Sequence, residues 1–579
     1  MCGIVGYIGY RQAAPVLLDG LKQLEYRGYD SYGIATSSEG LFIHKKKGKV
    51  SDFSPDEADL PGTCGIGHTR WATHGIPSDI NAHPHSDCHE GIAIVHNGII
   101  ENYAHLKREL LAKGHIFRSE TDTEVIPHLL EDQNQGDLLN AMQKIVQDLE
   151  GSYAILAISR DCDRLIAVKN RSPLVLGIGD NEVFAASDIT PLLEFTNRVI
   201  YLEDGDIAEI SADGYSIYQN SVRVSREIHE IEWTPEAVQK GGFPHFMIKE
   251  IFEQPEVINR ALHSLTLHSI PEFLYDARSI TLVACGSSYH AGLIFRYLAE
   301  SSCGIPVRVE LGSEFKYSSV PLTDVIIGIS QSGETADTLS AIHKGNCNNI
   351  QTVAVTNVLN SSITRYANAT ILMQAGPEIS VAATKSFIAQ LGVLLQVVNI
   401  LSGGMCDETL SHAGVAIEKV LLLNMEDAVT LCFKTQHLFY VGRGPFYPVM
   451  MEGALKMKEI SYIHAEAYAA GEIKHGPFSL LSSETPVVAI CLPGPSYAVM
   501  LGNLKEMKTR GTPIIAIGYG DDTELFELAD VVIPLDEDQL YLQIVAATVI
   551  LQMLAYYTAS RLGREIDKPR NLAKSVTVE

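Results

Sequence analysis

A cysteine stands at position 2, directly after the first methionine, in the apolar run MCGIVGY. Removal of Met1 would leave Cys2 with a free α-amino group, whose unperturbed pKa of about 7.7–8 provides a neutral amine near physiological pH. A nucleophile whose own terminal amine acts as the base is a known catalytic arrangement. Its thiolate suits attack on a carboxamide, which yields a thioester and ammonia. The alternative is an incidental cysteine at the start of the chain.

Four later residues could bind an amino acid and its amide. Arg70, in GHTRWATHG, could clamp an α-carboxylate with two hydrogen bonds, and Asp122, in SETDTEV, could pair with an α-ammonium. Asn97 and Gly98, in VHNGII, offer a side-chain amide and a backbone N–H to an oxyanion. The alternative for this Asn-Gly pair is a hairpin turn, because the dipeptide is a strong turn signal.

Two polar loops in the second half of the chain, ACGSSYHAG and ISQSGETADT, each follow an apolar run and precede a helical pattern. Hydroxyls and free N–H groups at a helix N-terminus bind anions without needing a lysine. Either loop alone could be only a polar turn with an N-cap, but two such loops in one α/β unit favour a phosphate ligand. The candidate residues are Ser287, Ser288, Ser330, Gln331, Ser332 and Thr335.

A third cluster lies in MEGALKMKEISYIHAEAYAAGEIKHGP. Glu452, Lys456 and Glu459 are spaced so that they share one helical face, and a carboxylate beside a lysine can move a proton between adjacent sugar carbons. His475 could open a sugar ring, and Lys574 could condense with the ketone as a Schiff base. The alternatives are a solvated stripe of ion pairs for the helix and a disordered tail around Lys574.

These residues need rigid elements to hold them. Residues 1 to about 225 are rich in short β-like runs, such as CGIVGYIG and GIAIVHNGII, which polar turns separate. Helical spacing of apolar residues predicts helices over 14–26 and 102–112, and a third that begins within 123–130. This mixture predicts a layered α/β or α+β domain. Residues 226–245 are polar, contain Pro and Gly, and are expected to form a linker.

The rest of the chain alternates strands, loops and helices. SITLVACGSSYHAG, VIIGISQSGETADT, LFYVGRGPFYP and PVVAICLPG each begin with an apolar strand and continue into a Gly-, Ser- or Pro-containing loop. Continuous apolar strands of this kind predict parallel sheets covered by helices. Because the pattern runs over about 265–400 and again over about 430–555, it predicts a weak internal duplication within an α/β multidomain protein.

The composition restricts the class of protein. The length of 579 residues predicts about three to five domains, and the hydrophobic fraction of 46% is that of a soluble globular protein. We expect no membrane partner, because no apolar run reaches the roughly 18–20 residues of a membrane span, and the N-terminus does not resemble a signal peptide. The formal net charge of -26 disfavours nucleic acid as a partner.

The cysteines and histidines predict neither disulfides nor a metal. Ten cysteines are scattered without C-x-x-C pairs, so a reducing cytoplasm is the expected location. One short span is dense in metal-ligand residue types, but it lacks standard zinc spacing, so no metal is predicted there. Its members are His68, His74, His83, His85, Cys88, His89 and His96.

The first part of the chain resembles the class II glutamine amidotransferase family. MCGIVGY, LEYRGYDSYGIA, GHTRWATHG, NAHPH, VHNGIIENY and SETDTEV occur in the family's order over roughly residues 2–220. The resemblance implies an N-terminal-nucleophile αββα sandwich with Cys2 as nucleophile and with Asn97 and Gly98 as the oxyanion hole. It also implies a glutamine pocket that consists of Arg70, Trp71, Thr73, His74 and Asp122.

The second part resembles paired sugar isomerase (SIS) domains, and the whole chain resembles the isomerising glutamine–fructose-6-phosphate aminotransferases, also called glucosamine-6-phosphate synthases. HAEAYAAGE, KHGP and the closing DKPRNLAKSVTVE are specific to that family. The resemblance implies Lys574 as the Schiff-base residue, Glu459 as the enolisation base, His475 in ring opening and Lys456 nearby. The implied substrate contacts are the sugar loop Gly286, Ser287 and Ser288, the phosphate loop Ser330, Gln331, Ser332 and Thr335, and a backbone contact at Val381.

One position departs from the family pattern: Ser287 stands where bacterial relatives commonly carry Thr, and a hydroxyl is kept. The resemblance implies glutamine and fructose 6-phosphate as substrates, no cofactor, and at least a homodimer in which His475 serves a neighbouring subunit. The expected divisions are a glutaminase domain at 2–225, the linker at 226–245, SIS domains at 246–415 and 416–565, and an active-site tail at 566–579. The alternatives are amination or deamination of a different sugar phosphate, and a sugar-phosphate-sensing protein with an inert amidotransferase half.

Overall fold

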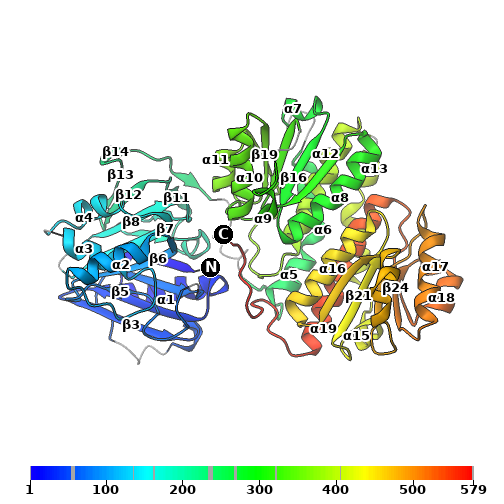
Figure 1. The fold of residues 1–579 in the computed structure, drawn as a ribbon, viewed down its shortest axis with the longest axis horizontal. Coiled ribbons are helices and arrows are strands. Elements are labelled where there is room, and N and C mark those ends of the chain that lie inside the picture. Colours follow the sequence, from blue (N-terminus) through cyan, green and yellow to red (C-terminus); the bar gives the residue numbers. More distant parts are fainter. Residues whose placement is uncertain are drawn as a thin grey trace. The chain divides into compact units, whose positions relative to one another are not determined.

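The computed structural model describes residues 2–53, 59–72, 74–134, 136–160, 164–231, 239–265, 270–319, 323–404 and 406–576. The chain forms two compact units (Figure 1). The first comprises Met1–Val238 together with Ala573–Glu579, and the second comprises Gln239–Leu572. The C-terminal segment that contains Lys574 therefore groups with the first unit.

Two antiparallel sheets form the centre of the first unit, in its described part. The first sheet has the order β15 (His229–Glu230), β11 (Arg198–Tyr201), β9 (Val175–Ile178), β10 (Val183–Ala186), β1 (Gly3–Ile8), β4 (Cys64–Arg70), β2 (Ser31–Ser37) and β3 (Leu41–Lys47). The second has the order β14 (Val222–Val224), β13 (Gly214–Gln219), β12 (Asp206–Ser211), β8 (Leu165–Asn170), β7 (Gly151–Ser159), β6 (Ile92–Ile100) and β5 (His85–Ser86).

The two sheets pack face to face and carry helices on their outer faces. Alternate residues of both sheets, such as Ile4, Ile66, Val95 and Leu156, form one buried apolar layer between them. Helix α1 (Ala13–Leu24) covers the first sheet. Helices α2 (Tyr103–Ala112), α3 (Val125–Gln133) and α4 (Leu138–Ile145) cover the second. The predicted αββα sandwich and its three predicted helices are confirmed.

Two parallel sheets, also confirmed, form the second unit. The first has the order β17 (Val307–Leu311), β16 (Ile280–Ala284), β18 (Val325–Ile329), β19 (Gln351–Thr356) and β20 (Ala369–Leu372). The second has the order β22 (His464–Ala469), β21 (His437–Gly442), β23 (Val487–Ile490), β24 (Ile514–Gly518) and β25 (Val531–Pro534). In both sheets the second strand in sequence lies at the edge, next to the first strand, and the third, fourth and fifth strands follow on the other side. The duplication that the sequence pattern predicts is therefore also present in the strand order.

Helices surround both parallel sheets. With the first sheet are α5 (Phe246–Phe252), α6 (Gln254–His263), α7 (Glu272–Tyr275), α8 (Gly286–Cys303), α9 (Gly312–Phe315), α10 (Ala336–Cys347), α11 (Ser362–Tyr366) and α12 (Lys385–Leu401). After them come α13 (Asp407–Leu410), α14 (Ala413–Leu421), α15 (Glu426–Cys432), α16 (Phe446–Ser461), α17 (Tyr497–Lys508), α18 (Thr523–Leu528) and α19 (Leu540–Arg561).

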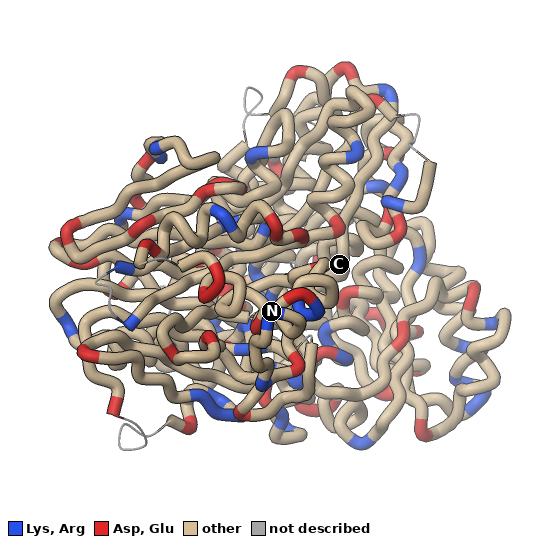
Figure 2. The backbone as a smooth tube through the Cα atoms, turned by 60° about the vertical axis from the view of Figure 1, so that its left-hand side comes forward, with Lys and Arg blue, Asp and Glu red and all other residues tan. Residues whose placement is uncertain are grey.

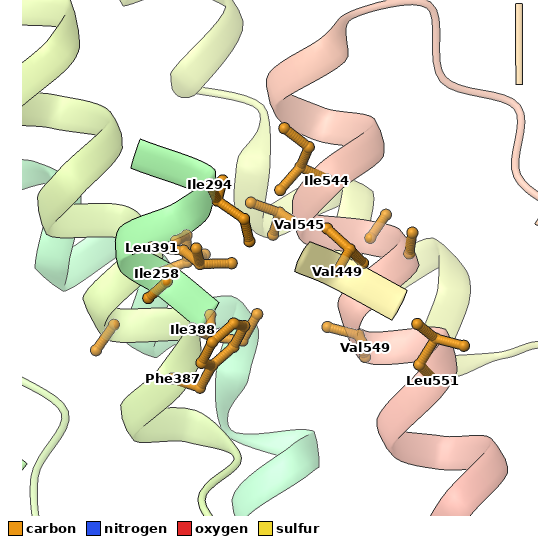
Figure 3. Close-up of a cluster of buried hydrophobic side chains, with 14 of the residues drawn as sticks. Ile258, Ile294, Phe387, Ile388, Leu391, Val449, Ile544, Val545, Val549 and Leu551 are labelled. Carbon is orange, nitrogen blue, oxygen red and sulfur yellow. The ribbon is translucent and has the colours of Figure 1, made fainter. Parts of the chain in front are cut away.

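One continuous apolar core joins the two halves of the second unit. In Figure 3, Ile294 and Leu391 from the first half lie on one side of the cluster, and Val449, Val545 and Leu551 from the second half lie on the other. Burying a side chain of this size contributes about 1.5–3 kcal/mol. The two parallel sheets therefore share one core within this unit.

Helix α19 corrects one expectation about membrane spans. Its length and apolar composition meet the criteria for a helix that crosses a membrane, although the sequence pattern had predicted none. Within the unit, 83% of its apolar window is buried, because α19 packs against α16 and α14. Charged residues of both signs are interspersed along the chain (Figure 2), and acidic ones outnumber basic ones.

The two segments expected to be irregular carry structure where they are described. Within the expected linker, His229–Glu230 pairs with β11 as strand β15, and 232–238 lie outside the described residues. In the terminal segment, Ile566 is fully buried, and the Asp567 carboxylate accepts hydrogen bonds from the N–H groups of Phe246 and Met247 at the start of α5. The disordered-tail alternative is therefore wrong for these residues.

Candidate active site

Cys2 immediately precedes β1, the buried strand between β10 and β4. Its thiol donates a hydrogen bond to the carbonyl oxygen of Trp71 at 3.5 Å, and its sulfur accepts one from the Trp71 N–H at 3.3 Å. Burial raises the pKa of the Cys2 thiol, while the chain N-terminus, the Trp71 N–H, Arg70 and Arg27 act in the opposite direction. The nucleophile candidate is thus fixed on a rigid strand beside positive charge.

Asn97 and Gly98 lie inside strand β6, so the hairpin-turn alternative is wrong. The Asn97 amide nitrogen donates to the backbone oxygen of Cys2 at 3.0 Å. Gly98 has φ of 125°, and a Cβ at this position would lie 1.9 Å from the Ser152 carbonyl oxygen, so only glycine fits. The two predicted oxyanion donors are therefore held next to Cys2.

Arg70 ends strand β4 and is buried. Its Nη2 donates to the carbonyl oxygens of His74 and Gly75. Its Nη1 is buried and has no hydrogen-bond partner among the described residues, a costly state that an incoming carboxylate would relieve. Burial lowers the pKa of Arg70, and the nearby Cys2 and Asp122 act against that shift.

The other predicted pocket residues lie around the same strand end. The Asp122 carboxylate is buried and accepts a hydrogen bond from the Ile100 N–H at 2.8 Å. The Trp71 ring, half-buried, meets the Tyr29 ring edge-on at 5.8 Å, and His74 is half-buried as well. Thr73 lies outside the described residues. The structure thus places the described members of the predicted set in one unit, close to Cys2.

Two residues that sequence reasoning did not assign support this site. The Asp30 carboxylate accepts a hydrogen bond from the Ala72 N–H at 2.9 Å and so fixes the chain beyond Trp71. Arg27 is buried and bonds to Asp188 at 3.1 Å, and its charge lowers the pKa of Cys2. Both residues lie in the motif LEYRGYDSYGIA, so this motif is the feature of the sequence that could have identified them.

In the second unit, the two polar loops follow strands β16 and β18, which are neighbours in the sheet. These strands mark the point where the strand order reverses, because β17 lies on the other side of β16. Open parallel sheets bind ligands at the carboxyl ends of such strands. The topology therefore brings the two loops together at the edge of the sheet where a ligand is expected.

The loop after β18 is organised by its own hydroxyls. Ser330 and Thr335 share a hydrogen bond of 2.8 Å between their hydroxyls, and Ser330 also accepts from the Gly333 N–H at 3.0 Å. Thr335 precedes α10 but makes no side-chain capping bond, so simple N-capping does not account for it. Gln331 and Ser332 are half-buried, and the Ser332 hydroxyl accepts from the Glu334 N–H at 3.2 Å.

The loop after β16 joins the acidic cluster on α16. Gly286 begins α8 with φ of 55°, and Ser288 is buried behind it. The Ser287 hydroxyl donates to Glu452 at 2.9 Å, and His290 Nδ1 lies 2.8 Å from the other oxygen of that carboxylate. Sequence reasoning did not assign His290, although it lies one helical turn beyond Gly286.

Glu452, Lys456 and Glu459 do share one face of α16, but this face is not solvated. Lys456 Nζ lies 2.5 Å from Glu459 and 3.5 Å from Glu452. The side chains of Glu452 and Lys456 are each 1% exposed, whereas that of Glu459 is 20% exposed. The solvated-stripe alternative is therefore wrong, and Glu459 is the member of the cluster that a ligand can reach most easily.

The cluster keeps its charges. Burial raises the pKa of Glu452, but Lys456, His290 and Ser287 outweigh it and hold that pKa below its ordinary value. Burial lowers the pKa of Lys456, but the carboxylates of Glu459, Glu452 and Glu378 outweigh it and raise that pKa. Lys456 therefore remains an ammonium ion, which stabilises the two carboxylates and is not a free amine.

Three predicted residues lie apart from this cluster. His475 ends the exposed 3-10 helix Glu472–His475, and its side chain is exposed. Val381 is buried, and its N–H donates to the backbone oxygen of Asp567 at 3.0 Å. Lys574 is half-buried in the C-terminal segment. The described contacts do not bring His475 to Glu452, Lys456 or Glu459.

The chain matches two family models. A model described as a glutamine amidotransferase domain matches residues 68–194. One described as a SIS domain matches residues 273–400 and 432–560, which cover the two parallel sheets. Among solved structures, the C-terminal domain of a glucosamine-fructose-6-phosphate aminotransferase from Francisella tularensis has 34% identity and a TM-score of 0.52, and the match covers 57% of this chain and 99% of that chain.

Curated relatives match over their full length. Proteins named isomerizing glutamine–fructose-6-phosphate aminotransferase from Methanothermobacter thermautotrophicus and Aquifex aeolicus are 46% and 44% identical to this chain, and each match covers 100% of both chains. A relative of the same name from Pyrococcus horikoshii is 45% identical over the same full span. Because these relatives are at least 44% identical to it over its full length, the chain belongs to the isomerising glutamine–fructose-6-phosphate aminotransferase family.

Proposed function

We propose that this chain converts glutamine and fructose 6-phosphate into glutamate and glucosamine 6-phosphate. The observation that carries the proposal is that one chain holds a thiol beside an amide donor and, in its second unit, two hydroxyl-bearing loops and a buried carboxylate–lysine cluster. The full-length relatives with this activity in their names support the same pairing.

In the first unit, the Cys2 thiolate attacks the carboxamide carbon of glutamine. Asn97 and the Gly98 N–H receive the oxyanion, and Arg70, Trp71, Thr73, His74 and Asp122 hold the amino acid. Collapse of the tetrahedral intermediate releases ammonia and leaves a thioester on Cys2, and water then hydrolyses the thioester to glutamate. The unpartnered Nη1 of Arg70 supports its role as the α-carboxylate clamp.

The loops Gly286–Ser288 and Ser330–Thr335 hold the sugar and its phosphate, with a backbone contact at Val381. Lys574 forms an imine with the ketone, which ammonia displaces, and water is the other product of this half-reaction. Glu459 moves a proton from C1 to C2 to complete the aldose, and His475 assists ring opening. The burial of Lys456 Nζ between Glu459 and Glu452 supports Lys574, and not Lys456, as the imine-forming lysine.

The assembly and location of the enzyme are part of this proposal. We expect at least a homodimer, because His475 is exposed and apart from the Glu459 cluster, as a residue that serves a neighbouring subunit would be. We expect a cytoplasmic location, since the nine cysteines that the structure describes form no disulfide with one another. Sedimentation of the purified chain would test the first point.

Product identification tests the reaction directly. The purified chain is incubated with fructose 6-phosphate and glutamine that carries nitrogen-15 in its amide, and the products are analysed by mass spectrometry. We expect labelled glucosamine 6-phosphate and unlabelled glutamate. Labelled ammonia without an aminated sugar, or amination of another sugar phosphate in preference, would reject the proposed acceptor. Lack of glutamine hydrolysis would instead favour a sugar-phosphate-sensing protein.

A further inference from the structure

Four metal-ligand side chains meet on the outer side of the second sheet of the first unit, away from Cys2 in the sequence. Cys88 lies in the turn between β5 and β6, His115 lies just after α2, and His128 and Glu131 lie on α3. Cys88 is 27 residues from His115 and 40 from His128. One ligand atom from each of the four lies within 4.8 Å of every other.

Their separations are those of ligands around one small ion. Cys88 Sγ lies 3.6 Å from His115 Nδ1 and 3.5 Å from His128 Nδ1. Glu131 Oε2 lies 3.1 Å from His115 Nδ1 and 3.5 Å from His128 Nδ1. A tetrahedral ion with bonds of about 2.0–2.3 Å requires ligand-to-ligand distances of about 3.2–3.8 Å. All four separations lie in or next to that range.

The second ring nitrogen of His115 also has a suitable partner. Its Nδ1 faces Cys88 Sγ and Glu131 Oε2, and its Nε2 lies 2.9 Å from Asp132 Oδ1. A carboxylate on the ring nitrogen that faces away from the metal is the usual arrangement of a ligating histidine. Lys113 in turn holds Asp132 at 2.6 Å.

The surroundings of Cys88 and Glu131 fit the same arrangement. The Ile116 N–H donates to the Cys88 sulfur at 3.5 Å, as backbone amides do towards a thiolate. The Cys88 N–H donates to Glu131 Oε2 at 3.2 Å, and His89 Nδ1 lies 2.5 Å from Glu131 Oε1. The side chains of His115, His128 and Glu131 are 9%, 1% and 16% exposed, so the cluster is largely shielded from water.

We propose that Cys88, His115, His128 and Glu131 bind a zinc ion. A thiolate, two imidazoles and a carboxylate form a ligand set that zinc accepts in tetrahedral geometry. Because four protein ligands complete the coordination sphere, the ion is structural. It ties the turn after β5 to α3 and to the connection between α2 and α3, which also carries Asp122.

The spacing of these residues explains why the sequence predicted no metal here. Of the cysteine and histidines between His68 and His96, only Cys88 belongs to the proposed zinc site. The rings of His68 and His83 instead lie with centroids 4.0 Å apart and tilted by 31°, and the His83 ring meets that of His85 at 4.7 Å. The remaining ligands come from two segments more than twenty residues further along the chain.

Metal analysis of the full-length chain tests the proposal. The reduced protein is equilibrated with zinc chloride and freed of excess metal by gel filtration. Its zinc content is then measured by elemental mass spectrometry. We expect about one zinc per chain in the unaltered protein and a loss of at least roughly tenfold in affinity for Cys88→Ser and for His115→Gln. The matched control is Cys347→Ser, because Cys347 is exposed on helix α10 and its sulfur lies 3.5 Å from the imidazole of His343. It should keep the full zinc content.

Cobalt and a chelator give two further readouts, each of which can be made on the unaltered protein. Cobalt bound to the apo-protein should show a thiolate-to-metal absorption band, which Cys88→Ser should lack. Chelation of the unaltered protein should lower its unfolding temperature, and zinc should restore it. Three results would overturn the proposal: both ligand variants keep their zinc, bound cobalt shows no thiolate band, or the folded chain takes up neither metal. In each case the four side chains would form only a hydrogen-bonded network without a metal.

Discussion

Ser287 at the start of α8 donates a hydrogen bond of 2.9 Å to Glu452 on α16. The first residue follows a strand of the first parallel sheet, and the second lies on a helix that packs on the second sheet. The sugar loop and the carboxylate–lysine cluster are therefore parts of one network, in which His290 holds the other oxygen of Glu452. A substitution in the sugar loop should therefore alter the contacts of Glu452, and a substitution of Glu452 should alter those of Ser287.

Removal of the nucleophile should separate the two half-reactions. Cys2→Ala is expected to abolish glutamine hydrolysis, because no thioester can form. Synthesis from added ammonium salt should persist at a low rate, since the sugar and phosphate loops lie in another unit. Cys347→Ser, at an exposed thiol, is the control and should behave like the unaltered chain. Glutamine-dependent synthesis by Cys2→Ala would show that another group is the nucleophile.

Asn97→Ala should act on turnover more than on binding. The loss of one oxyanion donor is expected to lower the glutaminase kcat by about 10²- to 10³-fold, while the glutamine Kd changes little, because the oxyanion exists only during the reaction. Rapid-mixing kinetics and calorimetry measure the two quantities. A large rise in Kd with unchanged kcat would reassign Asn97 to ground-state binding.

Glu452 should link stability to pH. Its folded-state pKa lies below the ordinary value, so its ionised form stabilises the fold above about pH 4.3. That stabilisation is lost as the pH falls through the lower folded-state pKa. Glu452→Ala should cost about 3–5 kcal/mol at neutral pH, because Lys456 loses a buried partner. Glu452→Gln should lose less and should show a shallower fall in stability towards acid.

Denaturant unfolding between about pH 7 and pH 3 measures both effects. The control is Glu524→Gln, since Glu524 forms an ion pair with Lys505 in which both side chains are more than half exposed. That variant should change the free energy of unfolding by less than about 1 kcal/mol. Equal costs for Glu452→Ala and Glu524→Gln would contradict the buried network.

Ser332 should recognise phosphate. Ser332→Ala is expected to weaken fructose 6-phosphate binding by roughly 10- to 100-fold, the loss of a hydrogen bond to a charged group, and to leave basal glutamine hydrolysis intact. Calorimetry measures the binding, and Ser411→Ala, at an exposed hydroxyl that bonds to Glu408, serves as the control. Normal binding by Ser332→Ala would remove this loop from the phosphate site.

Lys574 should form the covalent imine. Borohydride added with fructose 6-phosphate is expected to trap a sugar adduct on Lys574, located by peptide mass. Lys574→Arg should abolish trapping and synthesis together, because a guanidinium stays protonated, while glutamine hydrolysis continues. Lys505→Arg, at an exposed lysine, is the matched control. An adduct on Lys456, with Lys574→Arg still active, would contradict the assignment.

Local patterns decided much of the architecture. Alternation and apolar runs predicted the antiparallel first unit and the parallel second unit, because side-chain period and strand burial are properties of short segments. The same holds for α1, α2 and α3, whose apolar spacing marks one face. Motif order likewise predicted Cys2, Asn97 and Arg70, which lie just before β1, within β6 and at the end of β4.

Tertiary structure alone decided which polar groups are buried and what they face. The spacing of Glu452 and Lys456 fits an exposed stripe equally well, and only the packing of α16 against α8 and α19 removes them from water. In the same way, the Asn97-Gly98 dipeptide by itself predicts a turn, whereas the pairing of β6 with β7 places it inside a strand. The meeting of Cys88 with His115 and His128 depends on contacts between distant segments, and no local period encodes such contacts.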